Sequence, residues 1–120
     1  TNKVLTVLDI EPKIPAYNVR VLMYALRLNK SLETLQFSCS STCEEEGDCT
    51  LEEILNTLSK NTSLRVVWNH CYESFVVSEA MKQKTLNMLR NTPTIEQFHI
   101  FAEDPNCCYK KNALLEGNGV

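Results

Sequence analysis

The sequence predicts an α/β fold: a short right-handed strand–helix solenoid with a parallel concave sheet of about four strands and helices on the convex side. Three observations support this prediction. One apolar pattern recurs four times along the chain, its spacing is helical in one half of each unit, and it alternates in the other half. The chain has 120 residues, 43% hydrophobic and 22% charged, which is typical of one globular domain.

The repeat is anchored by four aliphatic residues that lie roughly 30 residues apart, as in known solenoid repeats. The anchors are Leu5, Leu32, Leu64 and Ile95. Three positions after the anchors stand Leu8, Leu35, Val67 and Phe98, and five positions after them stand Ile10, Phe37, Asn69 and Ile100. Asn69 is the exception in this second set, because it places a polar amide where the other units have an apolar side chain.

Helices are expected upstream of each anchor, and short strands at and after it. The first helix is indicated by Val19, Leu22, Met23 and Leu26, the second by Leu51, Ile54, Leu55 and Leu58, and the third by apolar residues between 76 and 89. Pro15 suits the approach to the first helix, since nothing upstream needs its missing amide. Thr50 and Glu53 match a capping box, which predicts that the second helix begins there. The acidic run 44–48 is then expected in a solvated loop.

The pattern L-x-x-L-x-apolar, with a helix upstream and Asn-x-Ser before the strand, resembles the leucine-rich repeat. It is most similar to the long repeats of the ribonuclease-inhibitor-like class. The resemblance covers residues 1–102, with units of about 1–28, 29–60, 61–91 and 92–102. Residues 103–120 are expected to form a partial repeat or a disordered tail. Because no polar cap precedes Leu5, we expect packing against further repeats or a partner at the N-terminal end.

Binding residues are expected on the open face of the strands, because strand side chains alternate between core and surface. If Leu64 and Val67 point inward, then Trp68 and His70 point outward. The candidate partner-binding residues are Trp68, His70, His99, Phe101, Gln36 and Asp9. An exposed Trp beside His and Phe is typical of a binding hot spot. A slip of the third strand by one residue would instead bury Trp68 and expose Asn69, and the sequence does not decide between the two registers.

The six cysteines allow several interpretations. Cys39, Cys43 and Cys49 with His70 and Cys71 could be zinc ligands, but their spacing fits structural zinc poorly. Cys39 and Cys71 occupy equivalent repeat positions, so a disulfide between them is geometrically conceivable. A catalytic reading would use Cys71 or a neighbouring Cys as the nucleophile and His70 or His99 as its base. Adjacent residues on a strand point to opposite sides, so His70 is badly placed to activate Cys71. We therefore expect no metal, no cofactor and no enzymatic activity.

Charge and hydropathy limit the classes of partner. Twelve Lys and Arg residues against fifteen Asp and Glu give a net charge of −3, which does not favour nucleic acid. No apolar run is long enough for a membrane span. The sequence thus predicts a non-catalytic module that binds a partner protein on its concave strand face. The alternatives are a structural segment of a larger repeat protein and a secreted, disulfide-stabilised recognition domain. The resemblance implies a cytoplasmic location, with secretion as the alternative.

Overall fold

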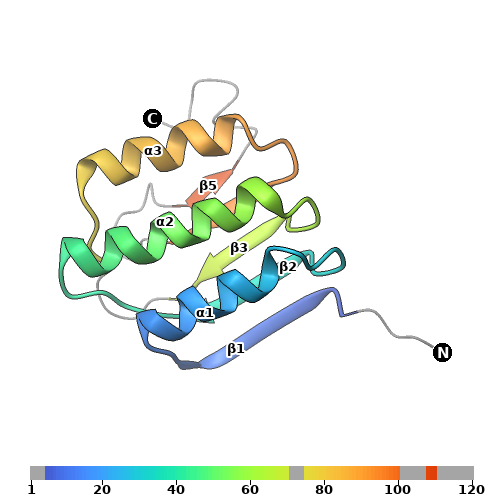
Figure 1. Ribbon diagram of the computed structural model, residues 1–120, viewed down its shortest axis with the longest axis horizontal. Coiled ribbons are helices and arrows are strands. Elements are labelled where there is room, and N and C mark those ends of the chain that lie inside the picture. The colour runs from blue at the N-terminus through green and yellow to red at the C-terminus, as the bar shows by residue number, and fades with distance from the viewer. Residues whose placement is uncertain (1–4, 71–74, 101–107, 111–120) are drawn as a thin grey trace.

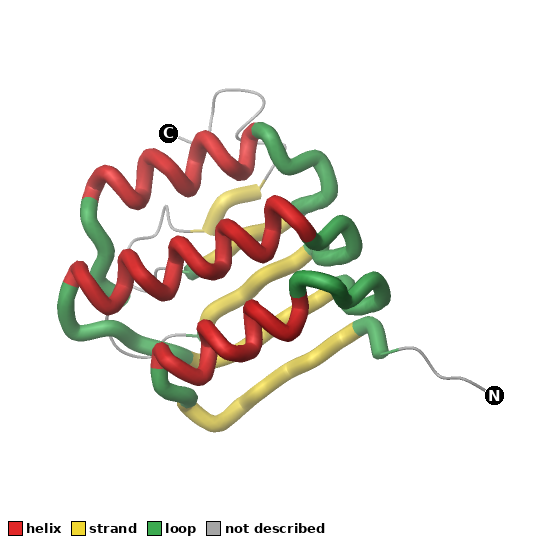
Figure 2. Tube along the Cα trace, viewed as in Figure 1, coloured by secondary structure: helices red, strands yellow, loops and turns green. Residues whose placement is uncertain are grey.

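The computed structural model describes residues 5–70, 75–100 and 108–110, and it is an α/β structure of two layers (Figure 1). The strands are β1 (Val7–Lys13), β2 (Thr34–Ser38), β3 (Val66–Asn69), β4 (Gln97–His99) and β5 (Cys108–Lys110), in the sheet order β1-β2-β3-β4-β5. The helices are α1 (Ala16–Leu26), α2 (Glu44–Lys60) and α3 (Glu79–Arg90). Figure 2 shows the three helices together on one side of the strands, and in the described part of the chain no helix lies on the other face of the sheet.

The first four strands are parallel and follow the repeat register that the sequence predicts. Leu8 pairs with Leu35, Leu35 with Val67, and Val67 with Phe98, so the positions three after each anchor form one row across the sheet. Leu35, Val67 and Phe98 are completely buried. The predicted α/β architecture, with four parallel strands and alternating helices, is therefore confirmed.

The hydrophobic core lies between the sheet and the helices. Anchors Leu32, Leu64 and Ile95 are at most 2% exposed, and they pack with the buried stripes of α1 and α2. Anchor Leu5 differs from the other three, because 59% of it is exposed at the edge of the stack. Burial of these apolar stripes against neighbouring units is the main driving force for the fold.

The start of α2 corrects the sequence prediction. The helix begins at Glu44, so the acidic run 44–48 is its first turn and not a loop. Carboxylates are favourable there because they face the positive end of the helix dipole. Thr50 lies inside the helix, where its hydroxyl donates to the carbonyl of Glu46, and Glu53 forms an ion pair with Arg27 of the preceding unit. The prediction of a capping box at Thr50 and Glu53 is therefore wrong.

The other two helices begin near the predicted places. Pro15 directly precedes α1, where its fixed φ and missing amide cost nothing. Ser78 caps α3, and its hydroxyl oxygen accepts from the amide of Met81 at 3.2 Å. Each of these caps satisfies or removes an amide that the first turn of a helix leaves unpaired.

Polar side chains tie the second unit to the first on the core side of the loops. The Thr57 hydroxyl donates to the carbonyl of Met23 at 2.9 Å. The buried Asn61 amide donates to the carbonyl of Leu26 at 2.7 Å, and its oxygen accepts from the amide of Leu64 at 2.9 Å. The Asn-x-Ser sequence has a shared local role, because the side-chain oxygens of Asn29 and Asn61 both accept from backbone amides of the loop that follows. Asn61 in addition bonds to an earlier unit.

At the far end of the sheet, β5 pairs antiparallel with β4, with Phe98 opposite Tyr109. This strand lies in the segment 103–120, for which the sequence predicts a partial repeat or a tail, and the sequence pattern gave no strand there. In the described part of the chain, no helix is long and apolar enough to cross a membrane.

Candidate strand-face site

The register of β3 places Trp68 on the open face of the sheet. Val67 and Asn69 are completely buried, whereas Val66, Trp68 and His70 are partly exposed. An inward-pointing Val67 belongs to the first of the two registers that the sequence allows. The slipped register, with Trp68 in the core, is not the one found.

The polar side chain of Asn69 can be buried because backbone groups of two other units form hydrogen bonds with it. Its Oδ1 accepts from the amide of Cys39 at 2.8 Å, and its Nδ2 donates to the carbonyls of Cys39 at 2.9 Å and Ile100 at 3.2 Å. A buried polar group that finds its partners avoids the cost of desolvation. Asn69 thus fixes the loops beside the strand face and holds Trp68 and His70 on the outer side.

Four of the predicted binding residues form one row across four strands. Asp9 pairs with Gln36, Gln36 with Trp68, and Trp68 with His99. The rings of Trp68 and His99 are stacked, with centroids 4.3 Å apart and planes 11° apart. The row therefore combines a pair of stacked aromatic rings on β3 and β4 with an amide and a carboxylate on β2 and β1.

His70 joins this row from the position after β3. Its Nε2 lies 2.7 Å from Oε1 of Gln36, and its ring centroid lies 6.1 Å from that of Trp68. Its backbone amide donates to the carbonyl of Phe37 at 2.6 Å, which fixes the residue beside the sheet. Since Gln36 Oε1 can only accept, Nε2 of His70 is the protonated nitrogen in this arrangement.

A hollow of about 540 Å³ opens beside the row, between β1 and β2. Its lining residues are Asp9, Ile10, Glu11, Gln36, Ser38 and His70. It forms where the pairing becomes irregular, because β1 advances from Asp9 to Lys13 while β2 advances only from Gln36 to Ser38. Asp9 and Glu11 are exposed on its β1 side, two positions apart and therefore on the same face of the strand.

Burial lowers the pKa of His99 below its ordinary value of 6.5, and the nearby His70 lowers it further. Burial acts because it disfavours the charged imidazolium, and His70 acts because a second positive charge would repel it. At neutral pH His99 is therefore an uncharged ring against Trp68.

The remaining predicted residue, Phe101, lies outside the described residues. Ser38 alternates with Gln36 along β2, but it is only 4% exposed. Its hydroxyl donates to the carbonyl of His70 at 2.9 Å, so it supports the floor of the hollow and fixes His70.

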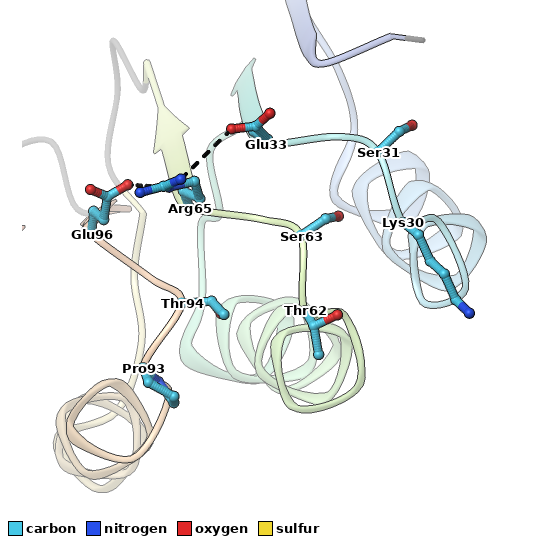
Figure 3. Close-up of a pocket in the computed structure, with 9 residues that line it drawn as sticks. All are labelled: Lys30, Ser31, Glu33, Thr62, Ser63, Arg65, Pro93, Thr94 and Glu96. Atoms are coloured by element: carbon cyan, nitrogen blue, oxygen red, sulfur yellow. Dashed lines mark hydrogen bonds and ion pairs between the residues drawn. The ribbon is translucent and has the colours of Figure 1, made fainter.

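A second groove, of about 640 Å³, lies along the loops that lead into the strands (Figure 3). Figure 3 shows Arg65 between two carboxylates, with Glu33 at 4.0 Å on one side and Glu96 bonded on the other. Sequence reasoning missed this group, although the three charges alternate in sign at the same offset from their anchors. Arg65 and both carboxylates of this groove are therefore already paired with one another, while Lys30 lines it without an ion pair among the described residues.

The cysteines of the described segments make no zinc cluster. Cys43 and Cys49 are exposed free thiols, and Cys39 is buried with its sulfur 3.6 Å from the carbonyl of Ser40. In the described residues, no group of three or more His, Cys, Asp or Glu side chains could hold a metal ion. Cys71, and with it the conceivable bridge to Cys39, lies outside them.

Stacked strand–helix units with equivalent residues in register define the class: a leucine-rich-repeat-like α/β domain with a polar and aromatic strand face. No protein-family model matches the chain, and no curated protein sequence matches it. Solved structures do match. One is of leiomodin-1 actin-binding site 2, with a TM-score of 0.60 at 10% identity over 87% of this chain. This chain spans 55% of that one, and the likeness shows a shared fold.

Another match is the C-terminal domain of tropomodulin from Caenorhabditis elegans. Its TM-score is 0.48 at 11% identity, over 92% of this chain and 82% of that chain.

Proposed function

We propose that the chain is a non-catalytic protein-interaction module, a segment of a leucine-rich-repeat solenoid of the ribonuclease-inhibitor-like class, and that it binds a partner protein on its concave strand face. The observation that carries this proposal is the continuous row Asp9–Gln36–Trp68–His99 on the face without helices. A rigid sheet holds these side chains in place before binding, which lowers the entropic cost of association. The expectation of a cytoplasmic location accompanies it and depends on the family resemblance alone.

Actin is the first partner to test. The matching leiomodin-1 structure is named for an actin-binding site, and it has the same fold over most of this chain. We expect the purified chain to bind actin with an affinity that depends on the strand face. The measurements are co-sedimentation with filaments and fluorescence anisotropy with monomeric actin.

The decisive variant is Trp68→Ala. A central, partly buried Trp at a protein interface contributes about 2 kcal/mol or more, so its loss should weaken binding by roughly 30-fold. The control is Asn87→Ala, which removes an exposed side chain from α3, in the helix layer. Equal affinity of Trp68→Ala and the unchanged chain, with actin or any other partner found, would contradict the proposal.

A specific observation favours a second candidate function, a structural segment of a larger repeat array. Among the described residues, large apolar side chains are exposed only in the first unit: Leu5, Val7, Tyr17, Val21, Tyr24 and Leu28. In the later units, the corresponding side of each helix contacts the unit before it, since Glu53 pairs with Arg27 and Lys84 with Glu52. Val21 occupies the position equivalent to Glu53 and Lys84, and it is 52% exposed.

The second candidate predicts that this surface is adhesive when no unit covers it. The 120-residue chain should self-associate in sedimentation velocity experiments and bind a hydrophobic dye, and Val21→Lys should reduce both effects. A monomer that stays monodisperse at high concentration and binds no dye would rule this candidate out. The two candidates are separable because Val21 and Trp68 lie in different layers of the molecule.

A further inference from the structure

We infer that the strand face binds an extended protein segment that carries a basic side chain two positions from an aromatic one. The basic group lies in the hollow between β1 and β2, and the aromatic ring contacts Trp68. This inference rests on the proposed function and names the chemistry of its partner.

The hollow selects a cation by charge. Two carboxylates, Asp9 and Glu11, line one wall, and none of the described lining residues is Lys or Arg. Lys13, two positions beyond Glu11 on β1, is not part of this lining. In the described part of the chain neither carboxylate has an ion pair, in contrast to Glu33 and Glu96, which share Arg65. Asp9 and Glu11 are therefore carboxylates without an ion-pair partner in the described residues, whereas both carboxylates of the loop groove in Figure 3 are paired with Arg65. A guanidinium fits best, because it is planar and can bond two carboxylates at once.

Polar groups beside the carboxylates would complete the contact. Gln36 lines the hollow and is bonded through Oε1 to His70, and its NH₂ group has no acceptor among the described residues. A carbonyl of an incoming backbone is the natural acceptor for it. The side chain of Gln36 lies between the carboxylates and Trp68, so it is well placed to hold the backbone that links the two partner residues.

The aromatic half of the surface is a preformed pair of rings. Trp68 is stacked on His99 at 4.3 Å, which fixes its ring plane before a partner arrives. The lowered pKa of His99 leaves that ring of the pair uncharged at neutral pH. Aromatic rings gain about 1 kcal/mol from packing against one another beyond the area that they bury.

The distance between the two halves sets the spacing in the partner. Asp9 is on β1 and Trp68 on β3, which are two strand spacings apart, or roughly 10 Å. An extended chain advances about 3.3 Å per residue, so side chains two positions apart are separated by roughly 7 Å. The length of an Arg side chain spans the remainder. The partner segment is therefore Arg-x-Phe in type, lying across the strands.

The test uses the single Trp of the chain as a reporter, because Trp68 is its only indole. The probe is the acetylated and amidated peptide Gly-Arg-Ser-Phe-Ser-Gly, titrated at low salt while the emission of Trp68 is followed. Two matched peptides replace its Arg by Glu or its Phe by Ser. We expect saturable binding of the first peptide, no binding of the Glu peptide, and weaker binding of the Ser peptide.

Variants of the protein assign the charge contact. An exposed ion pair contributes up to about 1 kcal/mol. The double variant Asp9→Asn with Glu11→Gln removes two of them, so it should weaken binding of the Arg peptide by about tenfold. Glu45→Gln is the matched control, since it removes an exposed carboxylate from α2 in the helix layer. It should leave the affinity for the Arg peptide unchanged. Added salt should weaken binding to the unchanged protein more than binding to the double variant.

Three outcomes would overturn the inference: no change in Trp68 emission with any peptide, equal binding of the Glu and Arg peptides, or no effect of the double variant. None of these would remove the proposed function, because a partner protein that loses affinity on Trp68→Ala would still bind the strand face by other chemistry. Conversely, a partner unaffected by Trp68→Ala would refute the proposed function whatever the peptides do.

Discussion

Replacement of Asn69 by Leu tests whether the apolar pattern of the repeat or the hydrogen bonds of Asn69 determine stability at this position. Leu would restore the apolar residue found at this position in the other units, where Ile10, Phe37 and Ile100 stand. Pattern logic alone therefore predicts a more stable protein. The structure predicts a less stable one, because the Asn69 amide forms hydrogen bonds with three backbone groups and Leu could form none of them.

The magnitude follows from those three contacts. Asn69→Leu leaves the amide and carbonyl of Cys39 and the carbonyl of Ile100 without their side-chain partner, at about 2 kcal/mol for each buried group. The larger apolar side chain regains about 2 kcal/mol by burial. The free energy of unfolding should thus fall by about 4 kcal/mol, a large part of the 5–15 kcal/mol that is typical of a domain, as a rough scale.

Urea unfolding followed by circular dichroism measures this loss, and Trp68 fluorescence gives an independent signal next to the mutated position. Asn87→Leu is the matched control: Asn87 is exposed on α3, so the same exchange should change stability by less than about 0.5 kcal/mol. If Asn69→Leu is as stable as the unchanged protein or more stable, the hydrogen-bonding role assigned to Asn69 is refuted.

Further predictions concern packing, thiols and pH. Gly47→Ala should destabilise the protein by about 2 kcal/mol in thermal unfolding, because a Cβ there would overlap the carbonyl of Val76. This loss is expected although Ala is the better helix former. A gain of stability would contradict the close approach of these segments. Cys43 and Cys49 should react quickly with a thiol reagent in the native protein, and Ser at both positions should remove two fast equivalents. Because the folded pKa of His99 lies below 6.5, the unfolded chain binds its proton more tightly, so stability should fall as pH drops from about 6.5 through the folded pKa. His99→Gln should flatten this dependence, and an unchanged pH profile would argue against the burial of the ring.

The fold could be predicted because each unit must bury the same apolar stripe against its neighbour. Leu35, Val67 and Phe98 lie in one row for this reason, and no information beyond their spacing was needed. The helix start was harder. Thr50 and Glu53 match a capping box, but an ion pair to another unit engages Glu53. A local motif therefore gave the wrong boundary where a long-range contact determined the role of the residue.

The site could be predicted only in part. Alternation from the anchor places Trp68 on the open face once the register is known. The register depends on Asn69, and its partners Cys39 and Ile100 come from two other units. The hollow was beyond prediction, since it arises from an irregularity in the pairing of β1 that no residue pattern announces.

The most direct test of the account is a set of proton contacts to Trp68 by nuclear magnetic resonance. Its indole protons should contact the ring of His99 at stacking distance and the side chain of Gln36, and they should make no contact to Leu64. Indole contacts to Leu64 and the other core residues would mean that the third strand is shifted by one residue. In that case Trp68 is core and the strand face described above does not exist.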